Sequence, residues 1–295
     1  MEYCLENEFL RVTVTTAGAQ VKSVLRKEDA VEHMWQADPE VWGFHAPILF
    51  PYTGRLKDNR LITGDRTIEN TPLHGFARDR EHTLVYQNRD TLVLQLTESP
   101  ETLAIWPWRF RLLSAFTLEG DTLRHTLTVE NRDEVPIQFG IGFHPAFNIP
   151  FDDRHTFRDY ELRFDALESP LCLSTWPRGL ITGETYCLGN NLTSIPIDEA
   201  LFAADSHCMV SLNSNTLGIY EKDSGRAVVL SIQGFPYCLL WSKPGEPRFV
   251  CIEPWNSLPS REDGSCIWEE KPAAARLAPG ESFSTVLTTA FRRNS

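Results

Sequence analysis

Four short segments combine titratable, aromatic and turn-forming residues in a way that packing alone does not require. They are LFPYTGRLKDN with Arg55, PLHGFARD with His74, GFHPAFNIP with His144, and FVCIEPW with Glu253. Together they supply a carboxylate, two imidazoles and a guanidinium, without a GxSxG nucleophile motif, a glycine-rich phosphate loop or an HExxH metal motif. A carboxylate and an imidazole can act as general base and general acid, so the set predicts proton transfer on a neutral polar substrate.

Glu253 follows the apolar run Phe249–Ile252 and precedes Pro254 and Trp255. A carboxylate at the end of a buried strand is costly unless it is paired or functional, so the alternatives are a buried Glu–Arg ion pair and a catalytic base. Burial would raise its pKa, whereas a nearby imidazolium or guanidinium would lower it. The adjacent Trp255 offers an apolar face on which a sugar could stack, which favours the functional interpretation.

His144 ends the small apolar run FGIGF, which is typical of a strand inside a sheet. Pro145 cannot continue an interior ladder, so we expect the chain to leave the sheet there. This places His144 at a strand end, where functional groups held by a scaffold are common. The alternatives are a core or loop histidine and a catalytic acid.

Arg55 and His74 each lie next to a glycine. Gly54 permits a tight or positive-φ backbone, so that Arg55 presents its five-donor fork to hydroxyls or a carboxylate, or else pairs with Asp58 on the surface. His74 precedes Gly75 and is expected to be partly buried on a bend, where it is either a ligand or a core histidine. Taken alone, the first segment favours a surface pair of Arg55 with Asp58, and the second favours a core histidine at His74.

Composition and charge narrow the class of protein. The chain has 295 residues and a net charge of -12, which disfavours nucleic acid and anionic membranes as partners. Its seven cysteines have no metal-binding spacing and are interpreted as small buried hydrophobes in a reducing compartment. The N-terminus lacks the pattern of a signal peptide, and no apolar run approaches the roughly 20 residues of a membrane helix. We therefore expect a cytoplasmic protein.

The periodicity predicts an all-β protein. Alternating apolar and polar residues give two hairpins, one pairing Thr83–Val85 with Leu92–Leu96 and one pairing Leu112–Leu118 with Leu123–Val129. The best helical signal is a turn or two near Asp198–Phe202, and residues 150–195 favour long loops with short strands. With no linker or repeat, residues 1–295 are expected to form a single domain, a large antiparallel β-sandwich.

In its motifs the sequence resembles the aldose 1-epimerases, also called galactose mutarotase-like proteins, and most closely their LacX-like branch. The matching strings are LFPYTGRLKDN, PLHGFARD, GFHPAFNIP, TFRDYELRF and LLWSKPGEPRFVCIEPW, in the order of the family. They cover the chain from about Arg11 to Phe291. The loop NSLPSREDG departs from the turn that many LacX-like relatives carry after CIEPW, which leaves substrate preference open.

The resemblance implies a supersandwich fold with an open cleft on one sheet, and mutarotation of a hexose without a metal or organic cofactor. It implies that Glu253 is the general base and His144 the general acid. The enzyme hypothesis then requires these two residues to face each other across a cleft about one sugar ring wide, with His74 and Arg55 alongside. His74 and Arg55 would hold the sugar and polarise its ring oxygen. Asp205 is the candidate for the family's hydroxyl-binding aspartate, with Asp198 as the alternative.

Two other functions stay open. A hexose-6-phosphate mutarotase would need a cationic pocket, and a non-catalytic carbohydrate-binding or sensing protein would need only the cleft. The contributors to a cationic pocket could be Arg78, Arg80, Lys243 and Arg248. Asn256 is a further candidate for reading hydroxyls. A small-molecule sugar is the expected substrate, and the chain could be a monomer or a homodimer.

Overall fold

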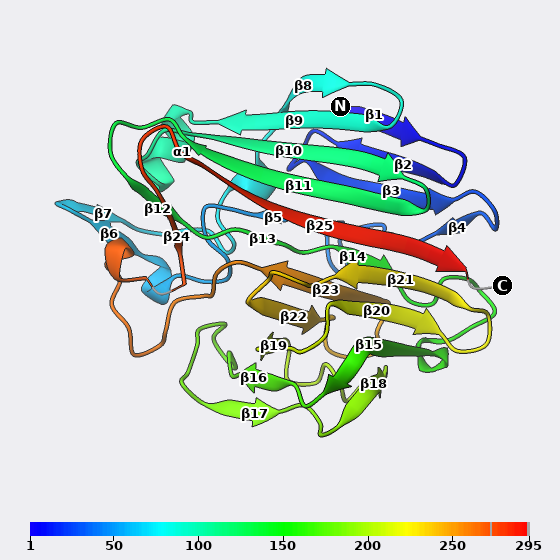
Figure 1. Cartoon of the computed structure of the whole chain (residues 1–295). Coiled ribbons are helices and arrows are strands. Elements are labelled where there is room, and N and C mark those ends of the chain that lie inside the picture. Colours follow the sequence, from blue (N-terminus) through cyan, green and yellow to red (C-terminus); the bar gives the residue numbers. More distant parts are fainter. Residues whose placement is uncertain (272, 294–295) are drawn as a thin grey trace.

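The computed structural model of the chain describes residues 1–271 and 273–293. Nearly all of its regular structure is β-strand, and the strands of its sheets pair antiparallel (Figure 1). The all-β class predicted from the alternation is therefore confirmed.

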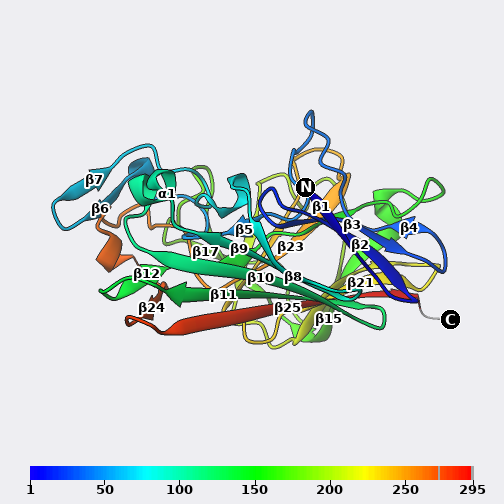
Figure 2. The ribbon, with the colours of Figure 1, turned by 90° about the horizontal axis from the view of Figure 1, so that it is seen from above.

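A nine-stranded sheet forms the near layer in Figure 1 and the lower layer when the molecule is seen from above in Figure 2, in the order β18-β15-β20-β21-β25-β11-β10-β9-β8. Its strands are β8 (Thr83–Gln87), β9 (Thr91–Thr97), β10 (Phe110–Glu119), β11 (Thr122–Asn131), β15 (Tyr160–Glu168), β18 (Leu192–Pro196), β20 (Thr216–Glu221), β21 (Arg226–Ser231) and β25 (Ser282–Arg293).

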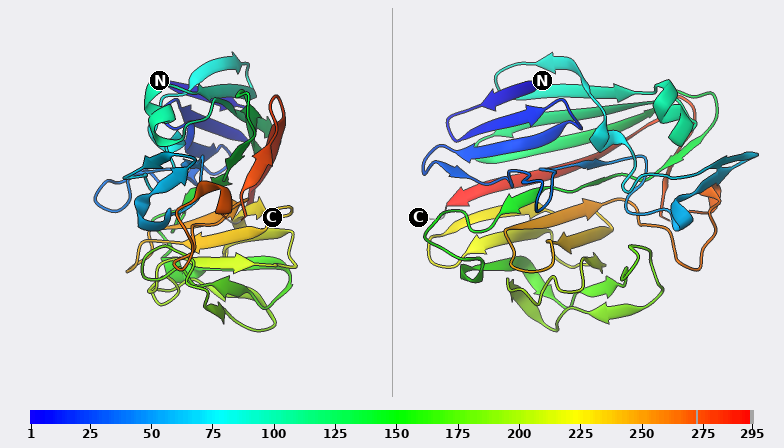
Figure 3. Two further views of the ribbon diagram at one scale, coloured as in Figure 1. Left: turned by 90° about the vertical axis from the view of Figure 1, so that its left-hand side faces the viewer. Right: turned by 180° about the vertical axis from the view of Figure 1, so that it is seen from behind.

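An eight-stranded sheet lies behind it, in the order β17-β16-β19-β22-β23-β13-β5, with β14 also pairing with β23. Figure 3 shows this layer from behind. Its strands are β5 (Ile48–Leu49), β13 (Gly142–Phe143), β14 (Ala146–Asn148), β16 (Leu171–Leu173), β17 (Thr185–Cys187), β19 (His207–Val210), β22 (Tyr237–Trp241) and β23 (Phe249–Trp255).

Smaller sheets complete the architecture. The N-terminal sheet contains β1 (Glu2–Glu6), β2 (Leu10–Thr15), β3 (Gln20–Arg26) and β4 (Val31–Glu32), and the two ribbons pair β6 (Leu61–Thr63) with β7 (Arg66–Ile68) and β12 (Ile137–Phe139) with β24 (Ala275–Leu277). The single α-helix of the described residues is α1 (Pro100–Ile105), and 3-10 turns span Lys57–Asn59, Ala77–Asp79, Phe157–Asp159 and Trp268–Glu270.

The core fills the space between these layers. On β10 every second residue is buried, which is the pattern of a strand with one face inward. On β23 all seven residues are buried, because one face packs into the core and the other is covered from the opposite side. Val250 and Ile252 belong to the main apolar cluster, so the odd-numbered residues of β23 point away from it.

Both predicted hairpins are confirmed by the pairing of β8 with β9 and of β10 with β11. The helical prediction near Asp198–Phe202 is wrong, since these residues form turns, and the helix α1 was not predicted. α1 depends on a local device that periodicity does not detect: Ser99 caps it in a capping box with Thr102. Residues 150–195 also contain β15, which at nine residues is longer than the short strands expected.

The cysteines separate into three groups by burial, and Cys266 alone is half-buried. All seven are free thiols, and Cys172, Cys208, Cys238 and Cys251 are buried as expected. Cys4 and Cys187 are exposed, which corrects the prediction, because one lies on the outward face of β1 and the other on the edge strand β17. Among the described residues, no helix combines the length and the apolar character needed to span a membrane.

Candidate active site

A cleft of about 280 Å³ opens on the face of the eight-stranded sheet that points away from the core. Leu239 and Trp241 of β22, with Glu253 and Trp255 of β23, form its sheet-borne part. Loops that carry Trp42, Arg55, His74, Arg78, Arg178 and Asp205 surround this part. The cleft is thus built from a rigid sheet face and a rim of loops.

Glu253 lies inside β23 and is only 2% exposed. Within residues 1–271 and 273–293 no lysine or arginine forms an ion pair with it, so the buried Glu–Arg alternative is wrong. Its polar neighbour is His144, whose Nε2 is 3.4 Å from Oε2 of the carboxyl group. The carboxyl group therefore meets an imidazole and the cleft, not a guanidinium.

The position of His144 follows from strand register. Gly142 of β13 is opposite Trp255 on β23, and Ala146 of β14 is opposite Cys251. The same register places His144 opposite Glu253, on the same face of the sheet. The expectation that the chain leaves the sheet at Pro145 is only partly right: pairing stops at His144 and Pro145 and resumes with β14.

The separation of the two groups corrects a second expectation. The enzyme hypothesis places them about one sugar ring apart, yet Nε2 of His144 is 3.4 Å from Oε2 of Glu253. Adjacent strands bring opposite side chains this close, because their Cβ atoms are typically about 4.5–5.5 Å apart. The acid and the base would then act on neighbouring atoms of a substrate and not on opposite ends of a ring.

Burial favours the uncharged form of each group. It raises the pKa of Glu253 well above its usual value, with the nearby negative charge of Asp205 acting in the same direction. Burial lowers the pKa of His144 to about 3, with a further contribution from the positive charge of Arg78.

His74 is fixed by two hydrogen bonds to Gly54. The amide of His74 donates to the Gly54 carbonyl at 2.9 Å, and the amide of Gly54 donates to Nδ1 of His74 at 3.0 Å. Nδ1 is therefore an acceptor, and the neutral ring carries its proton on Nε2. Burial lowers the pKa of His74 well below its usual value, as do His144, Arg78 and Arg55, which keeps the ring neutral.

The bend predicted at His74 is confirmed by left-handed φ values of +64° at His74 and +74° at Gly75. Gly75 is required there, because a Cβ would lie 2.2 Å from the carbonyl oxygen of Phe50. The ring of His74 meets the rings of His144 and Trp255 edge-on, at centroid distances of 5.5 and 5.6 Å.

Arg55 lines the cleft after Gly54, whose φ is +66° as predicted. Its Nη1 donates to the side chain of Asn59 at 3.0 Å, and the described residues give no ion pair with Asp58. The surface pair considered from the sequence is therefore wrong, and most of the guanidinium fork remains available to the cleft.

Asp205 is the aspartate that reaches the cleft. It accepts a hydrogen bond from the indole Nε1 of Trp241 at 2.5 Å and sits in a left-handed backbone conformation, φ +71°. Asp198 instead accepts from the amide of Leu201 in a turn, and neither Asp198 nor Asn256 lines the cleft. Trp241, which the sequence did not single out, thus orients the only cleft carboxylate besides Glu253 among the described residues.

Aromatic side chains enclose the imidazole of His144. The Trp42 ring stacks on the imidazole of His144 at 5.0 Å and on Phe249 at 5.4 Å, while Trp241 approaches His144 edge-on at 5.7 Å. Trp255 is 2% exposed and covers Gly142, so it contributes the floor of the cleft.

Of the four cations considered for an anion pocket, only Arg78 lines the cleft. Its guanidinium lies 4.6 Å from the ring centre of Phe44, and its Nε is 3.6 Å from the carboxylate of Asp79. Arg248 pairs with Asp38, and Lys243 donates to the carbonyl of Glu40, both at the rim loops.

Comparison with known proteins identifies the family of this chain. Residues 1–285 match the model of the family described as aldose 1-epimerase. The chain belongs to the aldose 1-epimerase family. It is 32% identical over 283 residues to the chromosomal protein LacX of Lactococcus lactis subsp. lactis, a match that covers 93% of this chain and 94% of LacX.

Solved structures related to this aldose 1-epimerase family member have the same fold. A galactose mutarotase related enzyme from Lactobacillus acidophilus superposes with a TM-score of 0.94 at 26% identity, covering 99% of this chain and 97% of that one. A galactose mutarotase-like protein from Lactobacillus casei ATCC 334 gives 0.91 at 25% identity, covering 99% of this chain and 100% of that one. The fold and family that the sequence motifs predicted are thus confirmed.

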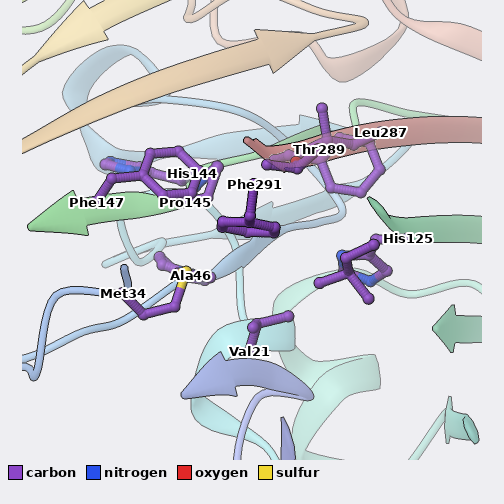
Figure 4. Close-up of a pocket in the computed structure, with 13 residues that line it drawn as sticks. Val21, Met34, Ala46, His125, His144, Pro145, Phe147, Leu287, Thr289 and Phe291 are labelled. Atoms are coloured by element: carbon purple, nitrogen blue, oxygen red, sulfur yellow. The ribbon is translucent and has the colours of Figure 1, made fainter. Parts of the chain in front are cut away.

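A second cavity lies between the sheets of this aldose 1-epimerase family member, behind His144 (Figure 4). It is lined mostly by apolar side chains such as Val21, Met34 and Phe291, and its volume is about 30 Å³. That space is too small for a sugar, since small-molecule pockets measure about 300–1,000 Å³. The cleft, at about 280 Å³, is close to that range. The cleft is therefore the candidate substrate site.

Proposed function

We propose that the chain interconverts the α and β anomers of a hexose through the open-chain aldehyde. The observation that carries this proposal is the pairing of His144 and Glu253, 3.4 Å apart at the base of a cleft. In mutarotation the base acts on the hydroxyl oxygen of C1 and the acid on the ring oxygen. Both oxygens are bonded to C1, so an adjacent acid and base match the reacting atoms.

In the empty cleft, burial favours a protonated Glu253 and a neutral His144. The proposed reaction starts once substrate binding has moved the proton of the pair to His144 and left Glu253 ionised. Glu253 takes the proton of the C1 hydroxyl while His144 donates its proton to the ring oxygen, and the C1–O5 bond breaks. The aldehyde rotates about C1–C2, and ring closure on the other face reverses both transfers. Each positioned acid or base typically contributes about 10²–10⁴-fold to the rate.

The other residues of the cleft hold the sugar in this scheme. His74 donates from Nε2 to a substrate oxygen, because its Nδ1 is occupied by the Gly54 amide. Arg55 offers donors to hydroxyl or ring oxygens. Asp205 accepts from a sugar hydroxyl while Trp241 holds its carboxylate, and Trp255 supplies an apolar surface next to Glu253.

The test is the optical rotation of freshly dissolved α-D-glucose and α-D-galactose, with wild type and Glu253→Gln compared. A matched control is Glu168→Gln, a substitution of an equally buried glutamate outside the cleft. We expect acceleration by the wild type and by Glu168→Gln, and its loss in Glu253→Gln with the fold intact by circular dichroism. Sugar binding without acceleration of any hexose would support a carbohydrate sensor instead.

A charged sugar is favoured by one specific observation. Three arginines, Arg55, Arg78 and Arg178, line the cleft of a protein whose net charge is -12. Arg178 is paired with the exposed Glu262. Nε of Arg78 is buried, and its carboxylate neighbour Asp79 is 3.6 Å away, so that among the described residues this nitrogen has an ion-pair neighbour but no hydrogen-bond partner. A phosphate or carboxylate group on the hexose would satisfy such donors. The same assay with a hexose 6-phosphate distinguishes the two substrates.

A further inference from the structure

A thiol lies beside the His144–Glu253 pair. Cys251 precedes Glu253 by two residues on β23, so both side chains project from the same face of the sheet. The Cys251 sulfur, one ring nitrogen of His144 and a carboxylate oxygen of Glu253 all lie within 4.8 Å of one another, and all three residues are buried. The three groups thus form a compact nitrogen, oxygen and sulfur donor set.

The spacing suits a tetrahedral ion. Zinc bonds to sulfur at about 2.3 Å and to nitrogen or oxygen at about 2.0–2.2 Å, so its ligand atoms lie roughly 3.3–3.8 Å apart. The His144–Glu253 edge is already 3.4 Å. The remaining edges are at most 4.8 Å, so they close with a small adjustment of side-chain torsions. Thiolate, imidazole and carboxylate are also the ligand types that zinc takes in proteins.

The surroundings leave room for a fourth ligand. Glu253 and His144 both line the cleft, which supplies a water or a substrate hydroxyl to the open position. Asp205 adds negative charge near Glu253, which favours a cation, whereas Arg78 near His144 opposes one. Glu253 has no competing cationic side chain within ion-pair distance among the described residues except His144 itself.

We infer that His144, Cys251 and Glu253 form a binding site for a zinc-type divalent cation that inhibits the enzyme by occupying the proposed acid and base together. Binding releases the thiol proton and the proton held by the pair to solvent, and no atom changes its oxidation state. The binding site stands on its own geometry, whereas the inhibition rests on the proposed function.

Cobalt provides a readout that does not depend on activity. Metal-free protein is titrated with Co²⁺, and we expect a thiolate-to-cobalt charge-transfer band that saturates at one ion per chain and disappears when Zn²⁺ is added. Cys251→Ser should lose the band. The matched control Cys238→Ser should keep it, because Cys238 lies on the neighbouring strand β22 but packs in the main core cluster. Cys251→Ala provides a second variant if the serine perturbs folding.

The activity arm then tests inhibition. Zn²⁺ should slow mutarotation and a chelator should restore it, and Cys251→Ser should raise the inhibitory zinc concentration by at least about 10-fold, the scale of losing one metal contact. A wild type without mutarotase activity would defeat the proposed function but not the cation site. Absence of the cobalt band, or its persistence in both folded Cys251 variants, would overturn the site.

Discussion

His144 lies opposite Glu253 in the register that β13 and β14 share on β23, and Nε2 of His144 is 3.4 Å from Oε2 of Glu253. The two residues are separated by more than 100 positions in the sequence, yet one strand pairing fixes their relation. A backbone ladder therefore aligns the proposed acid with the proposed base.

Because the two groups act on one anomeric centre, their losses should not add. We expect His144→Gln and Glu253→Gln each to lower kcat/KM by about 10²–10⁴-fold. The kcat/KM of the double variant should be only slightly lower than that of the less active single variant. Optical rotation with a common hexose measures all three. A double variant whose loss equals the product of the single losses would contradict the shared role.

Arg78 should matter only for a charged substrate. Arg78→Met should lower kcat/KM for a hexose 6-phosphate by about 10- to 100-fold, the worth of one charge-assisted hydrogen bond, and leave the free hexose nearly unchanged. Arg163→Met is the matched control, since Arg163 stacks over Tyr220 at 4.7 Å much as Arg78 stacks over Phe44. Equal losses with both substrates would refute an anion-binding role.

Trp241 should act through Asp205. Trp241→Phe keeps an aromatic ring and removes the indole donor that holds the Asp205 carboxylate. We expect KM to rise by about 10-fold with a smaller change in kcat, the effect of losing one hydrogen bond to a charged acceptor. Steady-state kinetics of this variant, Asp205→Asn and the double variant provide the check. If Trp241→Phe impairs the Asp205→Asn background equally, the two residues act independently.

Low pH should destabilise the folded protein through its buried histidines. Burial lowers the pKa of His33 to about 3, of His125 to about 3 and of His82 to about 4. Since the unfolded chain titrates near its usual value of 6.5, it takes up protons first, and stability falls as pH drops below about 6.5. For each of these histidines, the free energy of unfolding falls by about 1.4 kcal/mol per pH unit between pH 6.5 and the pKa of that histidine in the folded protein.

His33 is the sharpest test of this pH dependence, because neither ring nitrogen has a hydrogen-bond partner among the described residues. Urea unfolding at several pH values gives the slope of the unfolding free energy against pH. Below pH 6.5, His33→Phe should reduce this slope by the equivalent of about one proton. His155→Gln should not reduce it, since Asp152 raises the pKa of His155 and so stabilises the fold as that residue becomes protonated. An unchanged slope in His33→Phe would contradict the assignment.

Gly75 should tolerate no side chain. Gly75→Ala places a Cβ 2.2 Å from the Phe50 carbonyl oxygen at a left-handed φ, so we expect a loss of more than about 2 kcal/mol in the free energy of unfolding. Gly120→Ala has a similar φ of +60° but open space around the added methyl, and should cost about 1 kcal/mol. Denaturant melts of the two variants separate the clash from the backbone strain.

The sequence predicted the sheet-borne part of the site better than its rim. Alternation around Leu112–Leu118 and Leu123–Val129 identified a hairpin directly, because side chains on a half-buried strand alternate between core and water. Glu253 and His144 stood out because a carboxylate and an imidazole interrupted apolar runs. The 3.4 Å contact between them depends on non-local register, which periodicity does not specify.

The rim was harder to predict for a physical reason. Trp42, Trp241 and Arg178 lie in segments whose local composition is typical of loops or of a packed strand, and only the tertiary fold brings them to the cleft. Arg80, Lys243 and Arg248 look equally suitable in the sequence yet point elsewhere. Trp241 does carry a weak signal: it alternates with Leu239 on the strand before FVCIEPW, and both face the cleft.

Glu253 lies on β23, and His144 lies between β13 and β14, which both pair with β23, whereas Trp42, Arg55, Arg78, Arg178 and Asp205 lie outside the strands of this sheet. In the proposed function, reaction type and substrate choice are therefore carried by separate parts of the chain. Loops tolerate exchange more readily than the ladders that they connect. A chimaera of this chain with the rim loops of another family member should acquire the sugar preference of that member and keep its own anomeric chemistry. The scaffold is therefore suited to redesign by loop grafting.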